Sequence, residues 1–95
     1  MKQDRLIFVA YDIKDDKVRG KISRRLLYYG LVRIQFSLFR GYITTKDKSV
    51  LENDIRELVN EEEDKIHIIE ICESCRKNIR TIGDIPPPTP QHLII

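Results

Sequence analysis

The 95-residue chain has no tryptophan, only two cysteines and no long apolar run. Two cysteines are too few for the disulfide framework of a small secreted domain. The start MKQDRLIF has no apolar segment before a cleavage site, so we expect no signal peptide. No run approaches the roughly 20 apolar residues that a membrane helix needs. The composition therefore favours a single-domain cytoplasmic protein without a membrane partner.

Charged residues, in contrast, are plentiful and unevenly placed. Asp, Glu, Lys and Arg make up 34% of the chain, and the net charge is +2. Residues 1–48 hold 12 Lys and Arg against 5 Asp and Glu, whereas residues 49–95 hold 5 against 10. This asymmetry predicts either a face that attracts a polyanion or two ordinary solvated faces.

Hydrophobic periodicity predicts the order strand, helix, strand, strand, helix, strand, and then a short additional strand. The expected strands lie at 5–11, twice within 31–44, at 65–72 and at 78–83, and the expected helices at 17–29 and 49–59. Because 31–44 lacks an Asn-Gly or Asp-Gly turn, its two strands should meet at a kink, bulge or tight bend near 37–41. Ser49 with Glu52 fits a capping box, and Gly30 fits a helix end.

This order predicts the α+β class, with a ferredoxin-like βαββαβ domain over residues 1–84 and a Pro-rich tail over 85–95. Both helices would cover one face of the sheet. In so short a chain, a second subunit would have to cover the other face. We therefore expect a homodimer that packs through the sheet face.

Three aspartates follow the first predicted strand. Asp12 ends that strand, where ligand sites in α/β sheets lie, and its carboxylate suits Mg²⁺ or Mn²⁺. One carboxylate is a poor metal site, but two copies of Asp12 across a dimer axis would make a better one. Asp15 and Asp16 are better interpreted as residues that start the helix. For Asp12 alone, a structural role and a functional role both stay open.

The predicted first helix carries a basic stripe, to which two strand residues add. The six residues are Lys17, Lys21, Arg24, Arg25, Arg33 and Arg40. The stripe is either the solvated side of a helix or a footprint for a phosphate backbone. Arg19 either orients an aspartate, binds a phosphate, or forms a surface ion pair with Asp15 or Asp16.

The single C-x-x-C motif, Cys72 to Cys75, has no second pair with which to bind structural zinc. It also lies between a strand and a turn, whereas a thioredoxin-like motif precedes a helix. We expect small structural cysteines, with an intersubunit zinc or disulfide as the alternative. His67 and His92 receive no role, and no Ser–His–Asp or Cys–His arrangement is suggested by spacing.

Several of these segments together resemble the CRISPR-associated protein 2 family over about residues 5–84: YDI, DDKVRGKI, GLVRIQFSLFRG and IHIIEICESC followed by IGD. The resemblance implies a homodimer of the CRISPR adaptation module. It also implies a metal-dependent endonuclease acting on single-stranded RNA or double-stranded DNA. The alternative that it implies is a DNA-binding scaffold of spacer integration, whose partner is the integrase, CRISPR-associated protein 1.

The same resemblance implies a set of site residues. Asp12 from both subunits would face a divalent ion, and the other residues would be Arg19, Arg33, Ser37 and Phe39. The short strand at 78–83 would extend the sheet of the partner. A third hypothesis, a ferredoxin-like regulator that binds a small molecule, is disfavoured because the chain has no glycine-rich ligand loop.

Overall fold

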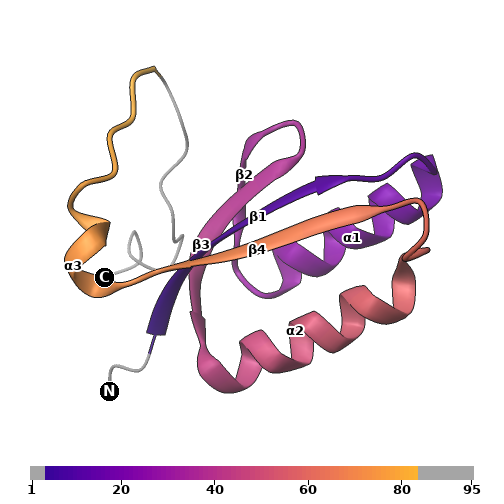
Figure 1. Ribbon diagram of the computed structural model, residues 1–95, viewed down its shortest axis with the longest axis horizontal. Coiled ribbons are helices and arrows are strands. Elements are labelled where there is room, and N and C mark those ends of the chain that lie inside the picture. The colour runs from indigo at the N-terminus through magenta and orange to yellow at the C-terminus, as the bar shows by residue number, and fades with distance from the viewer. Residues whose placement is uncertain (1–3, 84–95) are drawn as a thin grey trace.

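The computed structural model describes residues 4–83. These residues form β1 (Asp4–Asp12), α1 (Asp16–Tyr28), β2 (Val32–Gln35), β3 (Leu38–Thr44), α2 (Thr45–Leu58), β4 (Lys65–Ile71) and α3 (Glu73–Arg76) (Figure 1). The predicted tail, residues 85–95, lies outside the described residues, as does His92.

The four strands form one sheet in the order β2-β3-β1-β4, and all neighbouring strands are antiparallel. The two long helices, α1 and α2, lie side by side along the same side of this sheet (Figure 1). This is the ferredoxin-like βαββαβ architecture, and the predicted α+β class is confirmed. Within residues 4–83, no helix has both the length and the hydropathy for crossing a membrane.

The core lies between the helices and the sheet, because alternate β1 residues turn toward the helices. Ile7 and Val9 are fully buried there, and Ile22 of α1 and Leu51 of α2 are equally inaccessible. Burying a side chain of this size contributes about 1.5–3 kcal/mol. On the other face of the sheet, Phe8 is only half-buried, and its neighbour in the register, Ile69, is 47% exposed. The homodimer that would cover this face stays a prediction.

Helix α2 starts four residues earlier than the sequence predicted. Thr44 is its N-cap, and the Thr44 hydroxyl accepts a hydrogen bond from the backbone N–H of Asp47 at 3.1 Å. The prediction of a capping box at Ser49 is therefore wrong. The first turn of α2 is polar and has no apolar periodicity, so it resembled a loop in the sequence.

The β2–β3 hairpin turns at Phe36 and Ser37, with an irregular register between Arg33 and Gln35. The predicted bend near 37–41 is therefore shifted, because Gly41 lies inside β3. A Cβ atom at Gly41 would lie 2.9 Å from the Leu31 Cα atom. Glycine lets the chain that follows α1 pass close to β3 at this point.

The segment after β4 differs from the prediction in two respects. Cys72 leads directly into the short helix α3, where a turn was expected. Residues 77–83 form no strand within the described chain, so the short strand predicted at 78–83 is not formed in this chain. A strand requires a neighbouring edge to bond with. Within residues 4–83 this segment has no such neighbour.

Candidate functional site

Asp12 is the last residue of β1 and is exposed. Since Tyr11 is buried against the helices, the alternation of the strand places Asp12 on the opposite, helix-free face. Its partner in the β1–β4 register is Lys65. The structure therefore leaves the Asp12 carboxylate accessible at the end of a strand, as predicted.

The two following aspartates have local roles in starting α1. Asp15 is the N-cap, and its Oδ1 atom accepts hydrogen bonds from the amides of Lys17 at 2.7 Å and Val18 at 3.3 Å. Asp16 forms an ion pair with Arg19 in the first turn. The prediction that these residues start the helix is confirmed, with the capping role falling to Asp15.

Arg19 and Arg33 converge on the exposed ring of Phe36. Each guanidinium carbon lies 5.9 Å from the centroid of this ring, which is 71% exposed. Arg19 Nη1 donates to the Ile13 carbonyl oxygen at 2.6 Å, and Arg33 Nη1 donates to the Phe36 carbonyl oxygen at 3.0 Å. These backbone contacts hold two cations on one aromatic platform, which we call the Phe36 platform.

A hollow of about 170 Å³ lies beside this platform, lined by Tyr11, Asp16, Arg19, Gly20, Ser23, Arg33 and Phe36. Burial raises the pKa of Tyr11, and the charges of Arg33 and Arg19 oppose that rise. The Tyr11 hydroxyl therefore keeps its proton at neutral pH and can donate a hydrogen bond. The hollow also contains the Asp16 carboxylate, which is paired with Arg19, so Arg33 is the guanidinium group of the hollow that suits an anion such as a phosphate.

Ser37 and Phe39 are placed very differently from each other. The Ser37 carbonyl oxygen accepts a hydrogen bond from the Tyr11 amide at 3.1 Å, which ties the end of β1 to the β2–β3 turn. Phe39 is fully buried, and its ring stacks on Tyr11 with the centroids 6.2 Å apart. The Arg33 guanidinium carbon lies 5.1 Å from the Phe39 centroid. Phe39 therefore supports the site through its contacts with Tyr11 and Arg33.

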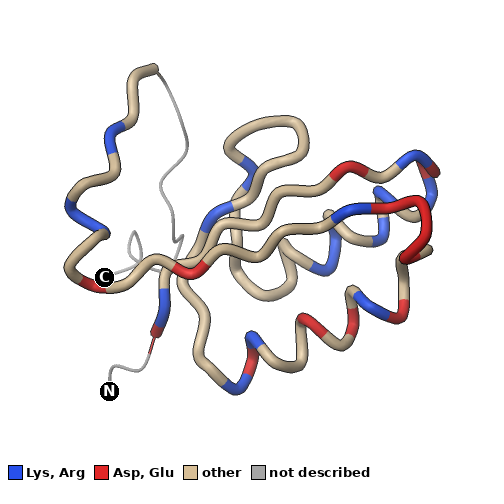
Figure 2. The backbone as a smooth tube through the Cα atoms, viewed as in Figure 1, with Lys and Arg blue, Asp and Glu red and all other residues tan. Residues whose placement is uncertain are grey.

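The exposed side of α1 carries a second basic feature. Lys21, Arg24, Arg25 and Tyr28 line a hollow of about 320 Å³ together with Leu58 of α2. Arg25 lies 3.6 Å from Asp54, whereas Lys17, Lys21 and Arg24 have no ion pair within residues 4–83. Figure 2 shows basic residues spaced along α1 and acidic residues gathered in the loop after α2. Three of the four basic residues predicted for the stripe on α1, Lys21, Arg24 and Arg25, therefore line one hollow.

Arg40 does not belong to that surface. It pairs in register with Phe8 of β1, on the face of the sheet opposite the helices, and its guanidinium carbon lies 5.5 Å from the Phe8 centroid. The prediction that Arg40 extends the basic stripe is wrong. Neighbouring strand residues face opposite sides, and the buried Phe39 fixes which side Arg40 takes.

Within the part of one chain that the structure describes, the donor groups are too few for a metal ion. Among residues 4–83, no three His, Cys, Asp or Glu side chains form a group that could hold a metal. Asp15 is used as a cap, and Asp16 is paired with Arg19. The chemistry of Asp12 suits Mg²⁺, but a site there requires further oxygen ligands, which a second copy of Asp12 would supply.

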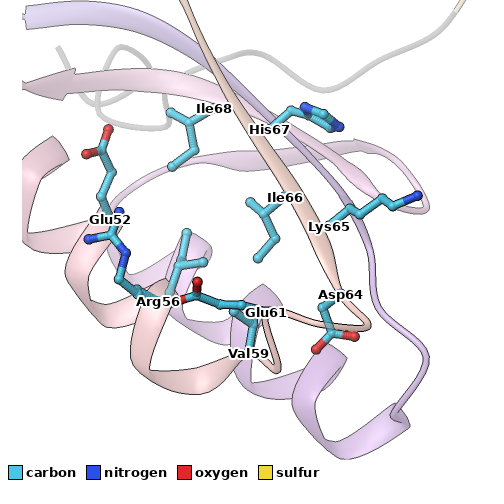
Figure 3. A pocket seen from close by; sticks show the side chains of 10 residues that line it. Glu52, Arg56, Val59, Glu61, Asp64, Lys65, Ile66, His67 and Ile68 are labelled. Carbon is cyan, nitrogen blue, oxygen red and sulfur yellow. The ribbon is translucent and has the colours of Figure 1, made fainter.

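A larger hollow, of about 450 Å³, lies away from these residues, between α2 and β4 (Figure 3). Ile66 and Ile68 form its apolar side, while Glu52, Arg56 and Glu61 line it from α2 and the following loop. None of the predicted site residues lines it. His67, to which the sequence assigned no role, is exposed and lines this hollow.

The Phe36 ring is the feature of the site that sequence reasoning missed. An aromatic residue between two strand segments resembles a core residue, and only the two-residue turn exposes it. The available signal was its place between Arg33 and Arg40 in a stretch that also contained the candidate Ser37.

The fold and site define a small ferredoxin-like α+β protein with an exposed strand-end carboxylate on one face of the sheet and two arginines against an exposed aromatic ring in the adjacent turn. Comparison with known proteins gives the family. The sequence profile of the family described as CRISPR associated protein Cas2 matches residues 5–79. The chain belongs to this Cas2 family.

Individual relatives agree with that assignment. The CRISPR-associated endoribonuclease Cas2 1 of Archaeoglobus fulgidus is 39% identical over 79 residues, covering 83% of this chain and 84% of the relative. A crystal structure of a hypothetical protein from Thermus thermophilus matches with a TM-score of 0.76 and 31% identity, covering 90% of this chain and 98% of the other. A chain of a partial Cas6-RT-Cas1–Cas2 complex matches with a TM-score of 0.68 and 29% identity, over 82% of this chain and 90% of the other.

Proposed function

We propose that this chain is a metal-dependent endonuclease that cleaves single-stranded RNA and acts in CRISPR adaptation. The observation that carries the proposal is the exposed Asp12 carboxylate at the end of β1, since the preceding residue, Tyr11, is hydrogen-bonded through its amide to the turn whose Phe36 ring lies against Arg19 and Arg33. Membership of the Cas2 family supports it, since the relatives of this chain are named endoribonucleases.

In this proposal, two copies of the chain bring their Asp12 carboxylates together. A divalent ion held between them would supply a bound water of lowered pKa. The guanidinium groups of Arg19 and Arg33 would bind the oxygens of the scissile phosphate and stabilise its developing negative charge. Tyr11 would donate a hydrogen bond from its protonated hydroxyl into the same hollow.

The Phe36 platform favours an unpaired strand as substrate. Unpaired RNA bases can stack on an exposed aromatic ring, whereas bases inside a duplex cannot. Stacking of one base contributes about 1–3 kcal/mol. Changing Phe36 to Ala should therefore weaken binding of single-stranded RNA by roughly 5-fold to 150-fold. Phe36→Trp should retain binding, and an equal loss in both variants would contradict stacking.

The test of catalysis compares the wild type with Asp12→Asn, with and without Mg²⁺, on single-stranded RNA and duplex DNA. Asp12→Asn should abolish cleavage while the oligomeric state and the melting temperature persist. Asp47→Asn is the matched control, because it removes an exposed carboxylate of the same type from the first turn of α2. An unchanged cleavage rate in Asp12→Asn would refute the assignment.

A second function is favoured by the basic surface along α1 and by the match to a Cas1–Cas2 complex. The chain would then act as a scaffold that holds duplex DNA next to the integrase. Lys17, Lys21 and Arg24 would contact phosphates, and Asp12 would be dispensable. Salt-dependent duplex binding and spacer integration that survive Asp12→Ala would establish this role. Loss of both would exclude it.

A further inference from the structure

Cys72 and Cys75 are nucleophilic side chains that neither proposed function uses. Both are exposed, at the junction between β4 and α3. The sequence-based expectation of small structural cysteines is wrong, because neither thiol is packed in the core. The objection to a redox motif also fails in part, since Cys72 is the residue that precedes a helical turn.

The backbone of this turn holds the two cysteines close together. The Cys75 amide donates to the Cys72 carbonyl oxygen at 3.1 Å, and the Arg76 amide donates to the same oxygen at 3.0 Å. A bond from residue i+3 to residue i tightens the turn and aligns the side chains of these two residues. Two cysteines three residues apart in one such turn have their backbones close enough for a disulfide to form with little backbone movement.

We propose that Cys72 and Cys75 form a reversible dithiol–disulfide site, oxidised by a low-molecular-weight disulfide such as glutathione disulfide. The Cys72 thiolate attacks one sulfur of the small disulfide, whose S–S bond breaks and releases one thiolate, which takes up a proton. Cys75 then loses its proton to solvent and attacks the Cys72 sulfur, and the second small thiol leaves. Two protein thiols are oxidised by two electrons, and one small disulfide is reduced to two thiols.

The surroundings of the pair assign the attacking role to Cys72. Hydrogen bonds from Ser74 and then Cys75 lower the pKa of Cys72 to about 7, and the Ser74 Oγ atom lies 3.4 Å from the Cys72 Sγ atom. The hydrogen bond to Cys72 and the charge of that residue raise the pKa of Cys75. Cys72 therefore ionises first, and the thiolate is the form that attacks a disulfide.

The disulfide would act on a turn that is anchored to the sheet. Arg76 Nη1 donates to the Tyr42 hydroxyl at 3.0 Å, and Arg76 Nη2 donates to Glu73 at 2.6 Å. The chain beyond α3 lines a hollow of about 310 Å³ with Phe8, Ile34 and Arg40 on the helix-free face. Closing the disulfide stiffens the turn from which this segment leaves the sheet.

The full chain is equilibrated in buffers with varying ratios of reduced to oxidised glutathione. Acid then stops the exchange, and after neutralisation iodoacetamide alkylates the free thiols, which are counted by mass spectrometry. As the buffer becomes more oxidising, the wild type should pass from two alkylated thiols to none. The oxidised chain should carry no glutathione adduct and no cross-link to another chain. Cys75→Ser should stop as a mixed disulfide of Cys72 with glutathione. Alkylation of the reduced wild type at increasing pH should label Cys72 first, with a midpoint near pH 7. Ser74→Ala should move that midpoint upward.

Three outcomes would overturn the proposal. One is a chain that keeps both thiols free at every glutathione ratio. Another is oxidation that yields only disulfides between chains or glutathione on both cysteines. The third is a reduced chain that binds Zn²⁺ through both cysteines and never closes the disulfide in its absence. Each readout is independent of nuclease activity, so failure here leaves the proposed function untouched.

Discussion

Replacing Asp15 with Ala tests whether the aspartates after β1 divide their roles as the structure indicates. The variant removes an acceptor for the amides of Lys17 and Val18, at 2.7 Å and 3.3 Å. Both hydrogen bonds are exposed, so water replaces the lost acceptor and no buried donor is left unpaired. The cost should be that of an N-cap, about 1 kcal/mol in the free energy of unfolding.

Asp15→Asn keeps an acceptor oxygen and removes the charge near the start of α1. It should cost only about 0.3 kcal/mol, the lower end of a helix-dipole contribution. A loss of 1 kcal/mol lowers the melting temperature of a domain of this size by about 4–8 °C. Melting followed by circular dichroism, at one protein concentration for all variants, measures the difference.

Cleavage by Asp15→Ala, assayed well below its melting temperature, should match the wild type. Two results would refute the reasoning. Equal destabilisation by Asn and Ala would show that the charge and not the cap is what matters. Lost cleavage in a fully folded Asp15→Ala protein would show that Asp15 belongs to the catalytic site.

Three further predictions follow from the packing and the charges. Gly41→Ala should lower the free energy of unfolding, measured in urea, by about 1–3 kcal/mol. The reason is that the added Cβ atom would lie 2.9 Å from the Leu31 Cα atom. An unchanged free energy of unfolding would contradict this close approach. Gly20→Ala is its control and should stabilise by up to about 1 kcal/mol, because the nearest atom is 3.4 Å away on the Arg24 side chain. Burial raises the pKa of Tyr11, although the charges of Arg33 and Arg19 oppose the rise. The protonated Tyr11 hydroxyl therefore contributes to the free energy of unfolding in full below about pH 10. This contribution is lost as the pH rises further, because the unfolded chain gives up the proton at a lower pH than the folded chain. In Tyr11→Phe, the free energy of unfolding should fall less between neutral and alkaline pH than in the wild type. An equal dependence on pH in the two proteins would contradict the raised pKa of Tyr11. For binding to duplex DNA, Arg24→Ala should reduce the steepness of log binding constant against log salt concentration by about 1. Lys46→Ala, at the start of α2, is the control and should leave this slope unchanged. Equal slopes in the two variants would argue against α1 as the DNA-binding surface.

The order of strands and helices was predictable because it depends on local periodicity. The apolar run that forms β1 and the stripe that buries Ile22 and Leu26 were both visible in the sequence. So was the end of α1 at Gly30, whose φ of +91° suits glycine. The start of α2 was missed because its polar first turn has no hydrophobic periodicity. The strand predicted at 78–83 would pair with the sheet edge of a partner subunit, and one chain does not contain that edge.

The candidate site was only partly predictable. Asp12 and Arg19 lie next to elements with clear boundaries, and the structure leaves both where the sequence placed them. Arg33 and Arg40 looked equivalent in the sequence, but the pairing of β3 with β1 sends them to opposite faces of the sheet. Phe36 became a site residue only because the turn exposes its ring between two arginines.

By itself, the sequence determined the βαββαβ order, a helix start at Asp15 or Asp16, a helix end at Gly30, and the place of Asp12 at the end of the first strand, because each depends on side chains a few residues apart. Tertiary structure alone decided which basic residues share a surface, why Phe36 is exposed and why both cysteines are accessible. These properties depend on strand register and on which face the helices cover, and both are set by contacts between residues far apart in the chain.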